Sequence, residues 1–251
     1  MQTRVKIIAG VSAAVLAAAG LTTGLILSGG SGPDKPGAGA GSSPGLLLSP
    51  FTGEPVPGPR LVLAVKIDNL VDARPQTGVS RADIVYVLPV EGGLSRLMAV
   101  FSSAFPPVVG PVRSARLEDL EVLRQFGRPA FAYSGAAPTA LPAINRARIV
   151  NLRDGLARGY FRDNRRAAPH NLYAHTSALR AQAKAGGASD AHSIGFRFGP
   201  APSGGTPVRS ESVSYPAASF RFTWSVARGR WLVWMDGARA ADQVNRNEAA
   251  E

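Results

Sequence analysis

Residues 83–101 of the chain read DIVYVLPVEGGLSRLMAVF, and this stretch decides the fold class. Residues 83–90 form an apolar run of strand length, and in residues 94–101 the side chains alternate as they do along a strand. Gly92 and Gly93 between the two runs are typical of a tight turn. We therefore predict an antiparallel β-hairpin, with Glu91 at its turn.

A buried strand is predicted before this hairpin. Residues 61–67 are apolar except for Lys66, and the run ends at Asp68 and Asn69. The strand should therefore carry polar groups at its C-terminal end, where loops on rigid elements often place functional side chains.

A helix is predicted over residues 115–126, because apolar residues recur there at helical spacing and Ser114 can serve as its N-cap. The remaining predictions are a strand over 130–133, short helices near 139–146 and over 177–185, and a hairpin over 220–226 and 231–235. Together they predict an α+β fold with a largely antiparallel sheet and a few short helices.

The N-terminus indicates export. Arg4 and Lys6 precede an uncharged stretch over residues 7–27, which is long enough to cross a bilayer with the N-terminus in the cytoplasm. We favour an uncleaved single-pass anchor in the cell membrane with an extracytoplasmic domain. Secretion after cleavage near Ala17-Ala18-Ala19 is the alternative, and a buried soluble helix is the third interpretation.

These patterns divide the chain into four parts. The predicted parts are an anchor or signal peptide over 1–27, a Gly/Ser/Pro-rich flexible linker over 28–48, an α+β domain over 49–236 with a hairpin region from about 206, and a polar tail over 237–251.

Composition limits the chemistry. The chain has 28 Lys and Arg against 17 Asp and Glu, a formal charge of +11, so its surface should attract anions. A high-GC genome is the alternative source of this bias. The absence of cysteine excludes disulfides, thiolate catalysis and cysteine zinc sites, and three histidines are few for a metal site. We expect neither a metal nor a cofactor.

The segment Arg113-Ser114-Ala115-Arg116 places two arginines at the predicted start of a helix. Cations there oppose the helix dipole, so an anionic ligand between them would stabilise the arrangement. Two alternatives remain open, which are pairing of both arginines with acids such as Asp68 or Glu91, and exposure to solvent.

Other polar clusters lie near predicted element ends. His170, beside Asp163 or paired with Asp68 or Glu91, is a candidate general base, although a histidine bonded to a loop carbonyl is the favoured interpretation. The candidate catalytic residues are His170, Asp68 and Glu91, and the candidate ligand-binding residues are Asn69, Arg74, Gln76, Arg113, Ser114, Arg116 and Asn171.

These clusters, in this order, resemble the YerB-like family of bacterial lipoproteins and envelope proteins, a domain of unknown function (DUF3048). The matching stretches are residues 51–56, 65–69, 73–78, 82–86, 90–93, 110–116, 161–163 and 168–173. The resemblance runs from about Phe51 to Asp236 and implies an exported, membrane-anchored protein. It implies no activity.

Two features depart from that family. The chain has no lipobox cysteine for a lipid anchor. Family members continue after the Asp-Gly end of the last hairpin with a further apolar strand, whereas here residues 245–248 read NRNE, so the family domain is expected to be truncated and a sheet edge unpaired.

The sequence therefore favours a membrane-tethered envelope protein that binds an anionic cell-wall polymer or an envelope protein. The alternative is a hydrolase or transferase of wall polymer that uses His170 with Asp68 or Glu91. A nucleic-acid role is disfavoured, because the chain carries an export signal and lacks a stripe of alternating aromatic and basic residues.

Overall fold

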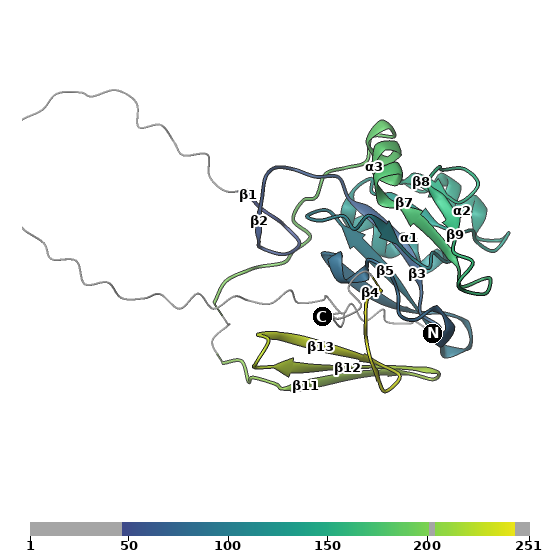
Figure 1. Ribbon diagram of the computed structural model, residues 1–251. Helices are drawn as coiled ribbons and strands as arrows, with labels where there is room; N and C mark the ends of the chain where they lie inside the picture. Colours follow the sequence, from purple (N-terminus) through teal and green to yellow (C-terminus); the bar gives the residue numbers. More distant parts are fainter. Residues whose placement is uncertain (1–46, 201–203, 244–251) are drawn as a thin grey trace, which may run out of the picture.

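The computed structural model describes residues 47–200 and 204–243, which form a mixed α+β structure with mostly antiparallel sheets and a few short helices (Figure 1). The helix predicted within 1–27 and nearly all of the linker predicted over 28–48 lie outside the described residues. Within the described ranges, no helix is long and apolar enough to span a bilayer.

The central sheet has five strands in the order β4-β5-β3-β7-β8. Their bounds are β3 (Leu63–Asp68), β4 (Ile84–Pro89), β5 (Ser95–Phe101), β7 (Ala130–Tyr133) and β8 (Val150–Arg153). The predicted hairpin is confirmed, because β4 and β5 pair antiparallel with Pro89 opposite Ser95. β3 also pairs antiparallel with β5.

The other half of this sheet is parallel, which the sequence analysis did not predict. β7 pairs parallel with β3, and β8 pairs parallel with β7. The crossovers are made by α1 (Leu117–Leu123), with η4 (Arg124–Phe126) following it, and by α2 (Leu141–Arg146). Both helices pack on one face of the sheet, since Val122, Leu123 and Ile144 share one core.

Side chains alternate between two cores on the two faces of the sheet. Val65 and Ile67 of β3 join a core with α3 (Thr176–Ala185), whereas Ala64 joins a second core with residues of α1 and α2. Every residue of β3 is buried, which explains why its sequence is apolar except for Lys66 and Asp68.

Shorter segments complete the body of the fold. A three-stranded sheet has the order β6-β10-β9, with β6 (Val108–Val109), β9 (Tyr160–Arg162) and β10 (Leu172–His175). β1 (Leu47–Leu48) pairs with β2 (Pro55–Val56), and the 3-10 turns are η1 (Val71–Ala73), η2 (Val79–Arg81) and η3 (Glu91–Gly93).

A four-stranded antiparallel sheet lies below the body in Figure 1. It contains β11 (Ser210–Tyr215), β12 (Ala218–Ser225), β13 (Arg230–Met235) and β14 (Ala238–Arg239). The predicted hairpin is confirmed in β12 and β13, and Phe220 and Met235 from these strands join the core of the central sheet.

Residues 237–243 have a structural role that their polar sequence does not suggest. Ala238 and Arg239 form β14 against β13, and Ala240 is buried in the core. Asp242, only 2% exposed, accepts hydrogen bonds from the backbone N–H groups of Gly78 and Ser80 at 3.0 and 2.8 Å. This segment therefore holds the loop after Gln76 in place, whereas a polar tail outside the core was predicted from residue 237 onward.

Candidate functional site

The sheet topology locates the candidate site. β3 and β7 are parallel and end on the same side of the sheet, and β5 begins there because it runs antiparallel to β3. Asp68, Arg96 and Ser134 lie at these ends or directly after them. Loops at the carboxyl ends of parallel strands are frequent ligand sites.

Asp68 is the centre of the site. Its side chain is 1% exposed, and its Oδ2 lies 2.8 Å from His170 Nδ1 and 2.8 Å from Arg113 Nε. Its Oδ1 accepts a hydrogen bond from the backbone N–H of Leu70 at 3.2 Å. One buried carboxylate thus contacts both Arg113 and His170, which come from distant parts of the chain.

The loop that carries Arg113 is attached to the end of β3. Arg113 N donates to Lys66 O and Asp68 N donates to Pro111 O, both at 2.8 Å. The peptide bonds that precede Pro75, Pro111 and Pro169 are cis. These backbone contacts hold the guanidinium group of Arg113 beside Asp68.

His170 pairs with Asp68 and not with Asp163, its predicted neighbour. Asp163 instead pairs with Arg165 Nη2 at 2.7 Å. The contact between His170 Nδ1 and Asp68 favours the tautomer with the proton on Nδ1, which leaves Nε2 as a proton acceptor. The side chain is 14% exposed, so the ring is within reach of solvent.

Arg113 has unused hydrogen-bonding capacity. Its Nε–H does not point along the 2.8 Å contact with Asp68, so that contact is an ion pair without a well-formed hydrogen bond. Within residues 47–200 and 204–243, no acceptor forms a hydrogen bond with the buried Nε, and the Arg113 side chain as a whole is 19% exposed.

Arg116 is held by Glu91. Nε and Nη2 of Arg116 donate to the two carboxylate oxygens of Glu91 at 2.6 and 2.9 Å, a bidentate pair. These hydrogen bonds lower the pKa of Glu91, whose side chain is 70% exposed. The predicted alternative of internal pairing thus describes both Arg113 and Arg116.

Arg96 is a third arginine of the site, and sequence analysis missed it. Its Nη1 donates to the carbonyl of Ser114 at 2.9 Å, and no carboxylate of the described residues lies at ion-pair distance from it. Burial, followed by the nearby charges of Arg116 and Arg113, lowers its pKa to about 10. The sequence does offer a sign of this role, because Arg96 is a charged residue on the same face of the predicted strand as the apolar Met98 and Val100.

A buried ion pair links β3 to α1 next to the site. Lys66 Nζ lies 2.6 Å from Asp119 Oδ1, and both side chains are fully buried. Burial lowers the pKa of Lys66 against the opposing effect of Asp119. Asp119 Oδ2 also accepts the backbone N–H of Arg116 at 2.8 Å, so it fixes the start of α1.

The predicted N-cap role of Ser114 is wrong. Arg116 occupies the N-cap position of α1, and Asp119 satisfies its backbone N–H from three residues further on. Ser114 Oγ lies 3.4 Å from Ser134 Oγ instead, and the carbonyl of Ser114 accepts the hydrogen bond from Arg96.

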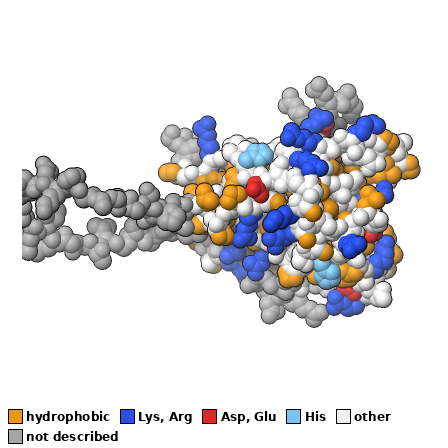
Figure 2. Space-filling view, turned by 90° about the horizontal axis from the view of Figure 1, so that it is seen from above, with side chains coloured by type: hydrophobic (Ala, Val, Ile, Leu, Met, Phe, Trp, Pro, Cys, Tyr) orange, Lys and Arg blue, Asp and Glu red, His pale blue; other side chains and the backbone are white. Residues whose placement is uncertain are grey.

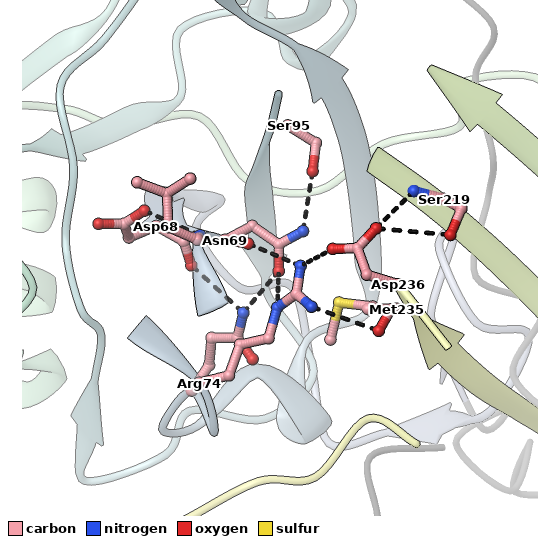
Figure 3. A network of polar contacts seen from close by, with 9 residues as sticks. Asp68, Asn69, Arg74, Ser95, Ser219, Met235 and Asp236 are labelled. Atoms are coloured by element: carbon pink, nitrogen blue, oxygen red, sulfur yellow. Dashed lines mark hydrogen bonds and ion pairs between the residues drawn. The ribbon is translucent and has the colours of Figure 1, made fainter. Parts of the chain in front are cut away.

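Asn69 and Arg74 form a network beside Asp68 (Figure 3), and Gln76 joins it through a hydrogen bond to Asn69. Asn69 Nδ2 donates to Ser95 Oγ at 2.9 Å, and Gln76 Nε2 donates to Asn69 Oδ1 at 2.7 Å. Arg74 Nη2 donates to the Asn69 carbonyl and to Asp236 Oδ2, each at 2.7 Å. The network joins the end of β3 to the four-stranded sheet, and ligand binding by these three residues stays a prediction.

The side chain of Asn171 also forms a hydrogen bond within the protein. Its Oδ1 accepts a hydrogen bond from Arg162 Nη1 at 2.7 Å, and the residue is 6% exposed. Asn171 therefore lies next to His170 in sequence but contributes to the loop around β9 and β10.

The described residues hold no group of three or more His, Asp and Glu side chains arranged to bind a metal ion. Two cavities of about 310 and 550 Å³ lie elsewhere in the described part, one lined by Phe161 and Tyr173 and the other by Leu123 and Ile149. The site around Asp68 is a cluster of charged side chains about one buried carboxylate. Ligand binding and acid–base catalysis at this cluster stay predictions.

Residues 51–189 match the family model described as "Protein of unknown function (DUF3048) N-terminal domain". The chain belongs to this family. It is 36% identical over 132 residues to a Bacillus subtilis protein named "Putative lipoprotein YerB", an alignment that covers 51% of this chain and 40% of that protein. The chain thus matches less than half the length of this curated relative.

The crystal structure of YerB from Bacillus subtilis has the same fold. The superposition gives a TM-score of 0.69 at 24% identity and covers 81% of this chain and 72% of that chain. The resemblance expected from the ordered clusters is confirmed, and the family has no established activity that defines the site.

Proposed function

We propose that this DUF3048 protein is a tethered envelope protein that binds an anionic ligand at the cluster formed by Arg96, Arg113 and Arg116. The observation that carries this proposal is the unused guanidinium group of Arg113, which lies 2.8 Å from Asp68 but completes no hydrogen bond within the described residues. The name of its relative supports an envelope location.

The charge balance of the cluster favours an anion. Three guanidinium groups face two carboxylates, Asp68 and Glu91, and Arg96 has only a backbone carbonyl as its direct partner. An arginine fork binds carboxylate and phosphate oxygens in a bidentate manner. A phosphate or carboxylate of a wall polymer would therefore satisfy the donors of Arg113 and offset the positive charge around Arg96.

The surrounding surface adds a favourable long-range field. The chain carries a formal charge of +11. Figure 2 shows Lys and Arg side chains distributed over one face with few Asp and Glu among them. Such a field attracts polyanions and should lose strength as salt increases.

The test is binding of poly(glycerol phosphate), a soluble phosphate-bearing wall polymer, to the full chain and to the double variant Arg113→Ala plus Arg116→Ala. The matched control is Arg124→Ala plus Arg165→Ala, which removes the same charge from two exposed arginines that are also paired with acids. The proposal expects binding to be lost in the first variant and kept in the control. Equal loss in both would leave only a non-specific charge effect.

A second candidate function is a hydrolase or transferase of wall polymer. The 2.8 Å contact between His170 Nδ1 and the buried carboxylate of Asp68 supports it, because such a contact orients an imidazole as a general base. In that mechanism Nε2 of His170 would take a proton from water or a hydroxyl group, and Arg113 would stabilise the developing negative charge.

Turnover of isolated peptidoglycan and of poly(glycerol phosphate) separates the two candidates. The enzymatic alternative expects product release that His170→Gln abolishes and that His192→Gln, at an exposed histidine outside the site, leaves unchanged. Polymer binding without product release, and without any effect of His170→Gln, would leave anion binding as the function.

A further inference from the structure

All three tryptophans of the chain lie on one hairpin, which no part of the proposed site uses. Trp224 is on β12, and Trp231 and Trp234 are on β13. Trp224 and Trp231 are partners across the strands, and their rings meet edge to face at 5.8 Å between centroids. Each tryptophan is only partly buried, so the aromatic side chains remain at the surface.

The turn of this hairpin is apolar and basic. Val226, in the turn that joins β12 to β13, is 83% exposed, and Val208, two residues before the neighbouring strand β11, is 49% exposed. Residues 208–230 carry four arginines and a single acid, Glu211. Exposed apolar and aromatic groups flanked by arginines match a bilayer interface, where tryptophan rings lie at headgroup depth and arginines meet anionic lipid.

The position of this turn in the molecule agrees with a membrane partner. β1, where the described chain begins after the predicted anchor and linker, and the β12–β13 turn lie at the same side of the molecule in Figure 1. Leu47 and Leu48 of β1 are 53% and 59% exposed. Phe198, 52% exposed, packs on the turn between β1 and β2 near Gly53. Leu47, Leu48, Phe198 and Val226 are thus exposed apolar side chains on segments at the side where an N-terminal tether would join the domain, whereas the exposed Val71, Leu117 and Leu156 belong to other segments.

We infer that the β12–β13 turn docks the domain onto an anionic lipid bilayer. Val226 and the rings of Trp224 and Trp231 would enter the headgroup region, and the arginines of residues 208–230 would contact lipid phosphates. This inference is independent of the arginine cluster around Arg113. It assigns a second contact with the membrane, in addition to any N-terminal anchor, and it would fix which way the Asp68 site faces.

The test uses the full chain reconstituted into vesicles that contain lipid with brominated acyl chains, which quench tryptophan fluorescence on contact. Because every tryptophan is on this hairpin, quenching reports the hairpin and not the N-terminal segment. We expect quenching in phosphatidylglycerol-rich vesicles, a smaller effect in phosphatidylcholine vesicles, and a loss of the difference at high salt.

Val226→Asp should abolish the quenching. The matched control is Leu156→Asp, which changes a residue 61% exposed after β8, and β8 and β9 lie at the other side of the molecule in Figure 1. Thermal unfolding of both variants checks that the fold is kept. Absence of quenching, equal quenching in both lipids, or quenching that Val226→Asp leaves intact would overturn the inference. A change of tryptophan emission with soluble peptidoglycan fragments, but not with vesicles, would assign the aromatic side chains to glycan and would also overturn it.

Discussion

Arg113 Nε and Asp68 Oδ2 lie 2.8 Å apart, and the same carboxylate oxygen lies 2.8 Å from His170 Nδ1. One buried aspartate, Asp68, therefore contacts both groups on which the two candidate functions depend. The charge of Asp68 compensates for only one of the positive charges in the cluster. The direct partner of Arg96 is the backbone carbonyl of Ser114 and not a carboxylate. The consequences of this imbalance can be measured.

Replacement of Arg96 by methionine should weaken the binding of poly(glycerol phosphate) about tenfold. One charge-assisted interaction is worth roughly 1.5–3 kcal/mol, and about 1.4 kcal/mol corresponds to a factor of ten. Isothermal titration calorimetry measures the change, with Arg124→Met at an exposed arginine as the control. Unchanged affinity in the Arg96 variant would show that this arginine is not part of an anion site.

Replacement of Glu91 by glutamine should strengthen the same binding. Glu91 occupies both Nε and Nη2 of Arg116, and its carboxylate competes with any anionic ligand. Because Glu91 is 70% exposed, the stability of the fold should change little. Glu121→Gln is the matched control, since Glu121 is 61% exposed and pairs with Arg124. A weaker affinity in the Glu91 variant would contradict the competition.

Replacement of Lys66 by methionine should lower the free energy of unfolding by roughly 3–5 kcal/mol, because Asp119 would remain buried without its charged partner. The double variant Lys66→Met plus Asp119→Asn should recover much of this loss. An asparagine oxygen can still accept the backbone N–H of Arg116, and no buried charge remains. Urea denaturation measures the free energy of unfolding of each variant. If the destabilisation by the two substitutions simply adds up in the double variant, Lys66 and Asp119 are not coupled.

Acidification should weaken the connection between Arg74 and Asp236. Burial opposes ionisation of Asp236, but hydrogen bonds from Ser219 and Arg74 outweigh it and lower the pKa below its usual value of 3.8. A depressed folded-state pKa adds stability that is complete above the unfolded pKa and is lost as pH falls through the folded pKa.

The stability difference between the unmodified chain and Asp236→Asn should therefore be larger at about pH 6 than at about pH 3. Asparagine suits the backbone there, because Asp236 has a φ of 52° and asparagine tolerates the left-handed region. Denaturation at both pH values measures the difference, and Asp72→Asn, at an exposed aspartate in η1, is the control. A difference that does not shrink on acidification would contradict this role of Asp236.

Local patterns predicted most of the elements but not their full arrangement. The run over residues 83–101 indicated the β4–β5 hairpin because its turn is short, and the alternation after Ala218 indicated β12 and β13. The parallel pairing of β3, β7 and β8 was not predictable in this way, because it depends on crossovers through α1 and α2. An isolated apolar run such as residues 130–133 carries no information about its partners.

The candidate site was predicted in part. Asp68, Arg113 and His170 stood in separate polar clusters, and the structure brings them together because β3 ends beside two loops. Arg96 was missed, since it lies within an apolar strand and outside those clusters. The role of residues 237–243 was missed because Asp242 acts through backbone N–H groups of a distant turn, which leave no signal in a sequence pattern.

The most direct measurement of the anion site is a titration of the full chain with inorganic phosphate, followed by NMR of the arginine Nε–H groups. We expect saturable shifts for Arg113 and Arg96 at phosphate concentrations that leave the exposed Arg124 and Arg165 unchanged. A result in which the exposed arginines shift together with Arg113, without saturation, or in which Arg113 does not respond at all, would contradict it.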